Sequence, residues 1–185
     1  LDKSVEVLSA LLESGNNVLV VTKAHPRCID RLVTVFESHR ANMEIRFTVG
    51  SANSTVLKIW EPGAPSFEER LEALRRAFDA RFVTSVSCEP LLDEDFDTLY
   101  AQVAPFVTTA IWVGKMNAAY RRVRVNVDGA FDERYLDALV ASQSDEKILE
   151  LYQRYRNKPN IAWKESIKKV ALRHGVWSDE SANGS

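Results

Sequence analysis

The sequence predicts an α/β fold with a parallel sheet, on the basis of three observations. Short runs typical of strands recur along the first part of the chain. Each run is followed by a segment with helical periodicity and short connections, which favours parallel strands joined by right-handed crossovers. After residue 117 only helical patterns follow. The predicted strands are residues 17–22, 44–49, 82–89 and 109–113.

Length, charge and cysteine content are those of an ordinary globular domain. The chain has 185 residues, enough for one domain with a sizeable core. Its net charge of -2 gives no general reason to expect a nucleic acid or an anionic membrane as a partner. No apolar run approaches the ~20 residues of a membrane span. Cys28 and Cys88 provide no disulfide framework, so we expect a cytoplasmic protein.

The N-terminal elements follow from the spacing of apolar residues. Residues 2–14 are predicted to form a helix that ends at Gly15. The run 17–22 is continuously apolar, which is typical of a strand buried on both faces. The helix that follows has its apolar positions at Ile29, Leu32, Val33 and Phe36.

The stretch from residue 44 to residue 80 changes from strand periodicity to helix periodicity. Over 44–49 apolar residues alternate with polar ones, which places Arg46 and Thr48 on one face of a strand. A short helical turn at 54–60 comes next. The helix at 66–80 is expected to begin with a capping box, because a serine precedes a glutamate by three residues.

The remaining elements divide the chain into two parts. The strand at 82–89 is closed by a proline, and an acidic segment at 93–97 suits the start of a helix. After the strand at 109–113 the predicted helices are residues 131–142, 145–156 and 161–174. We therefore expect a sheet-containing part with four strand–helix units at 1–117 and a helical C-terminal extension at 118–185 that packs on it.

Polar residues follow the predicted strands, and this is where ligands bind in parallel α/β proteins. The strand ends contribute Lys23, Lys115 and Glu89, while Arg46, Thr48, Ser85 and Ser87 lie within strands. One interpretation is a structural ion pair between Arg46 and Glu89 across the sheet. The other is a cavity that holds a polar cofactor, because two strand-end lysines and an inward arginine suit a carboxylate or phosphate.

Several stretches resemble the radical S-adenosylmethionine (radical SAM) proteins of the spore-photoproduct-lyase-like group, which includes DNA repair photolyase-like proteins. The most specific is Trp-Glu-Pro-Gly-Ala-Pro-Ser at 60–66, followed by Glu-Arg-Leu at 69–71. The other matching stretches are residues 20–23, 46–51, 85–90 and 111–117. The resemblance covers residues 1–117 well and the tail around 163–167 less specifically.

This resemblance implies a partial (β/α)6 TIM-like barrel and a cofactor pair. In the family, a [4Fe–4S] cluster cleaves S-adenosylmethionine reductively to a 5′-deoxyadenosyl radical, which abstracts hydrogen from a substrate. The cluster is held by a Cys-x3-Cys-x2-Cys loop, and Cys28 and Cys88 cannot supply it. Residues 1–3 already look like part of a helix, so we expect a fragment whose missing N-terminal barrel segment, with two strands and the cysteine loop, lies upstream of Leu1.

The resemblance also suggests which residues contact the cofactor. By this resemblance Arg46 and Thr48 face S-adenosylmethionine, with Ser87 and Glu89 on the next strand. Lys23 and Lys115 lie at the rim, where the methionyl carboxylate or a substrate anion is met. No residue of this chain is expected to bind the metal.

Three functions remain open from the sequence. The first is a fragment of a radical SAM enzyme with an unknown substrate, inactive by itself; nucleic-acid lesion chemistry is one family activity, but the net charge gives it little support. The second is a cluster-free barrel remnant that binds a ligand, or a partner protein through the edge of the strand 17–22. The third is an aldolase-like barrel that uses Lys23 or Lys115 as a Schiff base.

Overall fold

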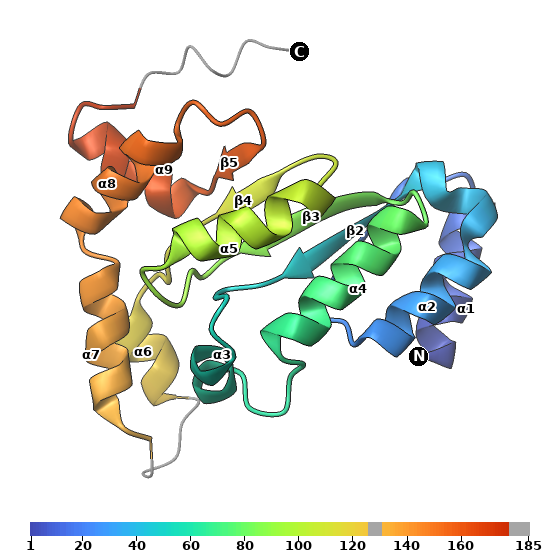
Figure 1. The fold of residues 1–185 in the computed structure, drawn as a ribbon, viewed down its shortest axis with the longest axis horizontal. Coiled ribbons are helices and arrows are strands. Elements are labelled where there is room, and N and C mark those ends of the chain that lie inside the picture. The colour runs from blue at the N-terminus through green and yellow to red at the C-terminus, as the bar shows by residue number, and fades with distance from the viewer. Residues whose placement is uncertain (126–130, 178–185) are drawn as a thin grey trace.

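The computed structural model describes residues 1–125 and 131–177, and its centre is a five-stranded sheet with every neighbouring pair parallel. The order of the strands in space is their order in the chain, so β1 and β5 are the edge strands (Figure 1). The predicted α/β class with a parallel sheet is therefore confirmed. The strands are β1 (Val18–Thr22), β2 (Met43–Thr48), β3 (Val83–Cys88), β4 (Ile111–Val113) and β5 (Ile161–Trp163).

The helices connect these strands and cover one face of the sheet. In Figure 1, α2, α4 and α5 lie on the viewer's side of the strands, while α3, α6 and α7 gather at one end. No described helix is long and apolar enough to cross a membrane. The helices are α1 (Asp2–Glu13), α2 (Pro26–Val35), α3 (Ser54–Trp60), α4 (Phe67–Asp79), α5 (Phe96–Val103), α6 (Ala119–Arg124), α7 (Glu133–Ser142), α8 (Asp145–Tyr155) and α9 (Glu165–Arg173), with 3-10 turns at Glu37–Asn42 and Ala104–Phe106.

The helix α4 begins at a capping box and packs its apolar side on the sheet. The Ser66 side chain accepts a hydrogen bond from the Glu69 backbone N–H, and the Glu69 carboxylate accepts one from Ser66, which completes the predicted capping box. The apolar stripe of the helix, including Leu71 and Leu74, is buried against the sheet. The capping box therefore sets where the helix begins, and packing against the sheet stabilises it.

The two faces of the sheet differ in chemistry because side chains alternate along a strand. The face toward α2, α4 and α5 is apolar, and Ile45, Phe47 and Val86 are fully buried there. The register places Arg46 beside Ser85 on the opposite face. We call this opposite side the polar face; it carries Glu44, Arg46, Thr48, Ser85, Ser87, Glu89, Trp112 and Lys164.

Two predictions about the strands are wrong. The strand 17–22 is not buried on both faces, because β1 is an edge strand and Leu19 and Val21 are 45% and 57% exposed. A later strand does exist: residues 161–163 pair with β4 as β5, and the helix predicted at 161–174 begins only at Glu165. The strand β5 has three residues, which are too few to give a periodic signal. The C-terminal extension thus contributes to the sheet, and its residues 126–130 and 178–185 lie outside the described part.

Candidate ligand-binding face of the sheet

The centre of the polar face is a closed network between β2 and β3. Arg46 donates one hydrogen bond from Nε to the Ser85 hydroxyl and one from Nη2 to Glu44 Oε1, each 2.9 Å long. The Ser85 hydroxyl in turn donates to the same Glu44 oxygen. Ser85 is fully buried, whereas Glu44 and Arg46 are only partly covered. The positive charge of Arg46 is therefore compensated by Glu44 within this network.

A second ion pair lies at the carboxyl ends of β3 and β5. The Lys164 ammonium is 3.0 Å from Glu89 Oε2, and both side chains are about one-third exposed. This pair approaches closely because residue 114 is glycine: a Cβ there would lie 3.0 Å from both Glu89 Cγ and Lys164 Cβ. A larger residue at 114 would push the two side chains apart.

Trp112 on β4 links the two charged groups. The Arg46 guanidinium carbon and the Lys164 ammonium nitrogen each lie 5.2 Å from the centre of its ring. A cation over an indole ring is attracted to the negative face of the ring. The indole is partly exposed, so the polar face combines one aromatic ring with two positive and two negative groups.

The predicted pairing of Arg46 with Glu89 is wrong. Arg46 instead pairs with Glu44, two residues away on the same strand and the same face, and Glu89 pairs with Lys164. Thr48 and Ser87 lie opposite each other in the β2–β3 register on the polar face, so the register brings together the two groups that alternation defines on the separate strands.

Lys23 belongs to a different network, at the carboxyl end of β1. Its ammonium lies 3.0 Å from Glu61, whose carboxylate also contacts the fully buried Arg70 at 2.5 Å. Arg70 donates further hydrogen bonds to the carbonyl oxygens of Pro65 and Thr48, at 2.9 and 3.1 Å. The Glu-Pro-Gly-Ala-Pro-Ser link is thereby fastened to the end of β2, which gives this specific motif a structural role.

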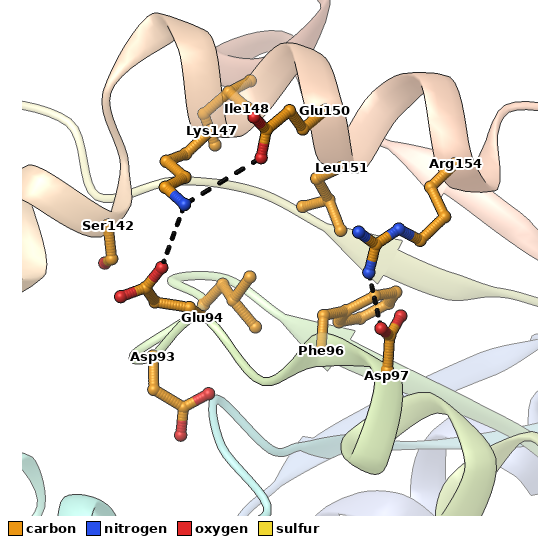
Figure 2. A pocket seen from close by; sticks show the side chains of 11 residues that line it. Asp93, Glu94, Phe96, Asp97, Ser142, Lys147, Ile148, Glu150, Leu151 and Arg154 are labelled. Atoms are coloured by element: carbon orange, nitrogen blue, oxygen red, sulfur yellow. Dashed lines mark hydrogen bonds and ion pairs between the residues drawn. The ribbon is translucent and has the colours of Figure 1, made fainter.

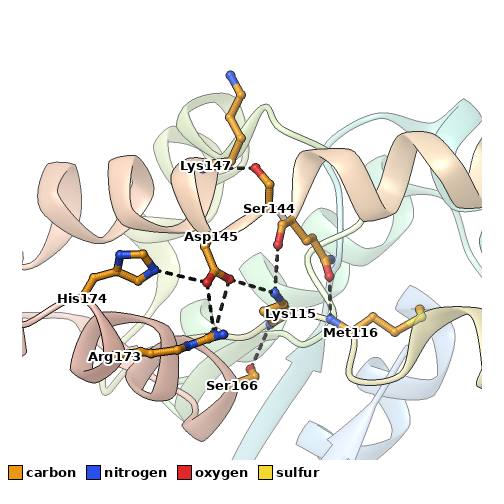
Figure 3. A network of polar contacts seen from close by, with 9 residues as sticks. Lys115, Met116, Ser144, Asp145, Lys147, Ser166, Arg173 and His174 are labelled. Atoms are coloured by element: carbon orange, nitrogen blue, oxygen red, sulfur yellow. Dashed lines mark hydrogen bonds and ion pairs between the residues drawn. The ribbon is translucent and has the colours of Figure 1, made fainter.

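Lys115 follows β4 and also lies within a structural network (Figure 3). Its ammonium donates to the Gln143 carbonyl oxygen over 2.9 Å and lies 4.0 Å from Asp145. Asp145 also pairs with Arg173 and His174, each at 3.2 Å, so the end of β4 is joined to α8 and α9. Both rim lysines contact oxygen acceptors, and the aldolase interpretation gains no support from this arrangement.

Sequence reasoning missed Glu44, Trp112 and Lys164 as members of the polar face. Glu44 shares the alternation of Arg46 and could have been found from it. Trp112 is flanked by two apolar residues and gives no polar signal. Lys164 was hidden by the helix prediction, although the short apolar run after Pro159 and before this lysine is the pattern of a brief strand.

The described residues do not fit a [4Fe–4S] cluster. Cys88 lies on the helix-covered side of β3, where burial, with a smaller contribution from the negative charge of Asp93, raises the pKa of its thiol far above the ordinary value. Cys28 lies on α2 and is partly buried. Within the described ranges no three His, Cys, Asp or Glu side chains are placed to hold a metal ion.

Asp93 is a further unusual group, at the carboxyl ends of β2 and β3. Its carboxylate accepts hydrogen bonds from the Ser51 hydroxyl and from the Asp95 backbone N–H. Burial raises the pKa of Asp93 above its ordinary value; these hydrogen bonds oppose the rise, and the charges of Asp95 and Glu94 add to it.

Replacing Asp93 with Asn is expected to raise the free energy of unfolding at neutral pH, because the amide carries no charge to desolvate. The raised pKa means that the folded chain keeps the Asp93 proton in a pH window above about 3.9 in which the unfolded chain has released it. The native protein therefore loses stability as pH rises through this window, and the amide removes that loss. Urea unfolding of both proteins between about pH 3 and pH 7 tests this; a difference that does not change with pH contradicts it.

Comparison of the chain with protein-family models finds no match, and comparison with curated proteins finds none.

Proposed function

We propose that the polar face binds S-adenosylmethionine and that it is part of a radical SAM-type barrel. The sequence does not identify the substrate of such a barrel. The observation that carries the proposal is that two ion pairs, Glu44–Arg46 and Glu89–Lys164, lie around the ring of Trp112. A ligand with charges of both signs and a flat ring is complementary to such a surface.

Each part of the ligand has a matching group on this face. The methionyl carboxylate suits Arg46 or Lys164, because both present donors that now contact carboxylates of the protein itself. The ammonium and sulfonium cations suit Glu44 and Glu89. The adenine ring suits the partly exposed indole of Trp112. Binding exchanges the internal ion pairs of this face for contacts with the ligand.

The contribution of this chain to a reaction is binding and orientation. S-adenosylmethionine supplies a radical only beside a reduced iron–sulfur cluster, and the described cysteines do not fit one. A fragment of a radical SAM enzyme therefore needs cluster ligands from other residues.

Equilibrium dialysis with radiolabelled S-adenosylmethionine tests the proposal. We expect saturable binding at millimolar concentrations or below, and a loss of about tenfold, or about 1.4 kcal/mol, in Trp112→Leu and in Arg46→Gln. Arg154→Gln is the matched control, because Arg154 is an exposed arginine that pairs with Asp97 on α5. No retention of the ligand, or equal retention by all variants, contradicts the proposal.

A specific observation favours the second candidate, a cluster-free barrel remnant that binds a partner. The edge strand β1 exposes Leu19 and Val21 on the side away from the helices, and an uncharged edge strand can accept a further strand. This function is favoured if S-adenosylmethionine is not retained and Val21→Lys changes the association state in light scattering.

A further inference from the structure

A small apolar cavity lies between α3 and α7, at the end of the sheet where α3, α6 and α7 gather (Figure 1). Its volume is about 210 Å³. An apolar cavity of about 150 Å³ is known to hold benzene, so this one has room for a compound with a single ring. Trp60 on its wall is held by packing against Phe131, with ring centres 5.7 Å apart. The apolar and aromatic lining is Val56, Ile59, Trp60, Leu92, Tyr135, Ala138 and Leu139.

The loop after β3 places two carboxylates, Asp93 and Glu94, at this cavity, and they differ in their partners. Glu94 is 3.5 Å from the Lys147 ammonium, in a neighbouring pocket between the start of α5 and α8. Figure 2 shows Glu94 directed toward Lys147 and Asp93 directed to the other side of the loop. In the described part of the chain Asp93 contacts a hydroxyl and a backbone N–H but forms no ion pair.

We propose that this cavity binds a small organic cation, an ammonium group on an apolar body, with the ammonium at Asp93 and the body against Trp60 and Leu139. A carboxylate without a counter-charge beside an apolar wall attracts a group that brings the opposite charge. The apolar lining disfavours a hydrated metal ion, and Asp93 disfavours an anion. The inference uses none of the residues of the polar face, so it can fail or succeed independently of the proposed function.

Two probes of the same shape separate charge recognition from apolar binding. Benzylamine carries the ammonium, whereas benzyl alcohol presents a neutral hydroxyl on the same ring. In ¹⁵N-labelled protein at neutral pH, we expect benzylamine to shift the amide signals of residues around Trp60, Asp93 and Leu139, with an affinity about tenfold higher than that of benzyl alcohol. Equal affinities, or shifts that map to another part of the chain, overturn the proposal.

Three variants locate the effect. Asp93→Asn is expected to reduce the affinity for benzylamine to that for benzyl alcohol. Glu150→Gln removes one carboxylate from the neighbouring pocket, outside the cavity, and is expected to leave both affinities unchanged. Ala138→Phe adds bulk at an exposed position of the lining and is expected to abolish binding of both probes.

The comparison of the two charge variants is decisive. If Asp93→Asn keeps the preference for benzylamine, or if Glu150→Gln weakens it equally, the attraction belongs to the general negative charge of this surface and the proposed site is wrong. Thermal unfolding of each variant checks that it is folded, and Asp93→Asn is itself expected to be at least as stable as the unaltered protein.

Discussion

Replacing Arg70 with methionine is expected to lower the free energy of unfolding by about 3–5 kcal/mol. Arg70 is fully buried and lies 2.5 Å from Glu61. It also satisfies the carbonyl oxygens of Pro65 and Thr48. Methionine retains much of the side-chain volume but leaves the mostly buried Glu61 carboxylate with Lys23 alone and removes both hydrogen bonds to the backbone.

Chemical denaturation measures this effect, and α4 itself offers a matched control. Arg76 lies on the same helix and pairs with Asp30 and Glu72, but it is 38% exposed. Arg76→Met is therefore expected to cost much less stability than Arg70→Met. Adding Glu61→Gln to Arg70→Met should recover part of the loss, because the amide carries no charge to leave uncompensated. If Arg70→Met costs no more than Arg76→Met, the buried pair does not hold the link to β2.

Replacing Gly50 with alanine is expected to cost about 2–3 kcal/mol of stability. A Cβ at this position would lie 2.7 Å from the Pro90 carbonyl oxygen and 2.8 Å from two side-chain carbons of Leu92. The two segments are also joined by a hydrogen bond, in which the Leu92 N–H donates to the Gly50 carbonyl oxygen at a distance of 2.7 Å. The Pro90 carbonyl oxygen belongs to the backbone and cannot rotate away as a side chain could. The loop after β3 must therefore move away from the end of β2.

Gly63→Ala separates this steric cost from the conformational cost of losing a glycine. Gly63 has a φ of +81° and nothing within 4 Å of an added Cβ, so the substitution is expected to cost about 1 kcal/mol through backbone strain alone. Urea unfolding of both variants should give the larger loss for Gly50→Ala. A smaller loss there would mean that the loop after β3 adapts without strain.

Elements that local patterns specify could be predicted from the sequence. The capping box of Ser66 and Glu69 and the apolar stripe of α4 depend on residues within a few positions of each other. The same holds for the alternation that groups Arg46 with Thr48 on one strand and Ser87 with Glu89 on the next; the register of the two strands places both groups on the polar face. The apolar run at β1 predicted a strand correctly but not the exposure of Leu19 and Val21. Burial of a strand depends on which other elements cover each face of the sheet.

The partners within the site could not be predicted, because they depend on strand order and register. Arg46 meets Ser85 across 39 residues of chain. Glu89 meets Lys164, which directly follows the three-residue strand β5. A strand that short has no periodicity and forms only because β4 offers a free edge beside it. The apolar run at 161–163 is compatible with a brief strand, but nothing local to it indicates that the strand pairs with β4.

The position of β5 in the chain sets the order in which the polar face is assembled during synthesis. The strands β1 to β4 leave the ribosome consecutively and each can pair with the one before it. Trp112 stays on the outer strand of the growing sheet until α6, α7 and α8 have been made and Ile161–Trp163 pairs with β4. Glu89 acquires its cation only when Lys164 follows. A nascent chain that stalls in α8 therefore has four of the five described strands but lacks Lys164 on the polar face.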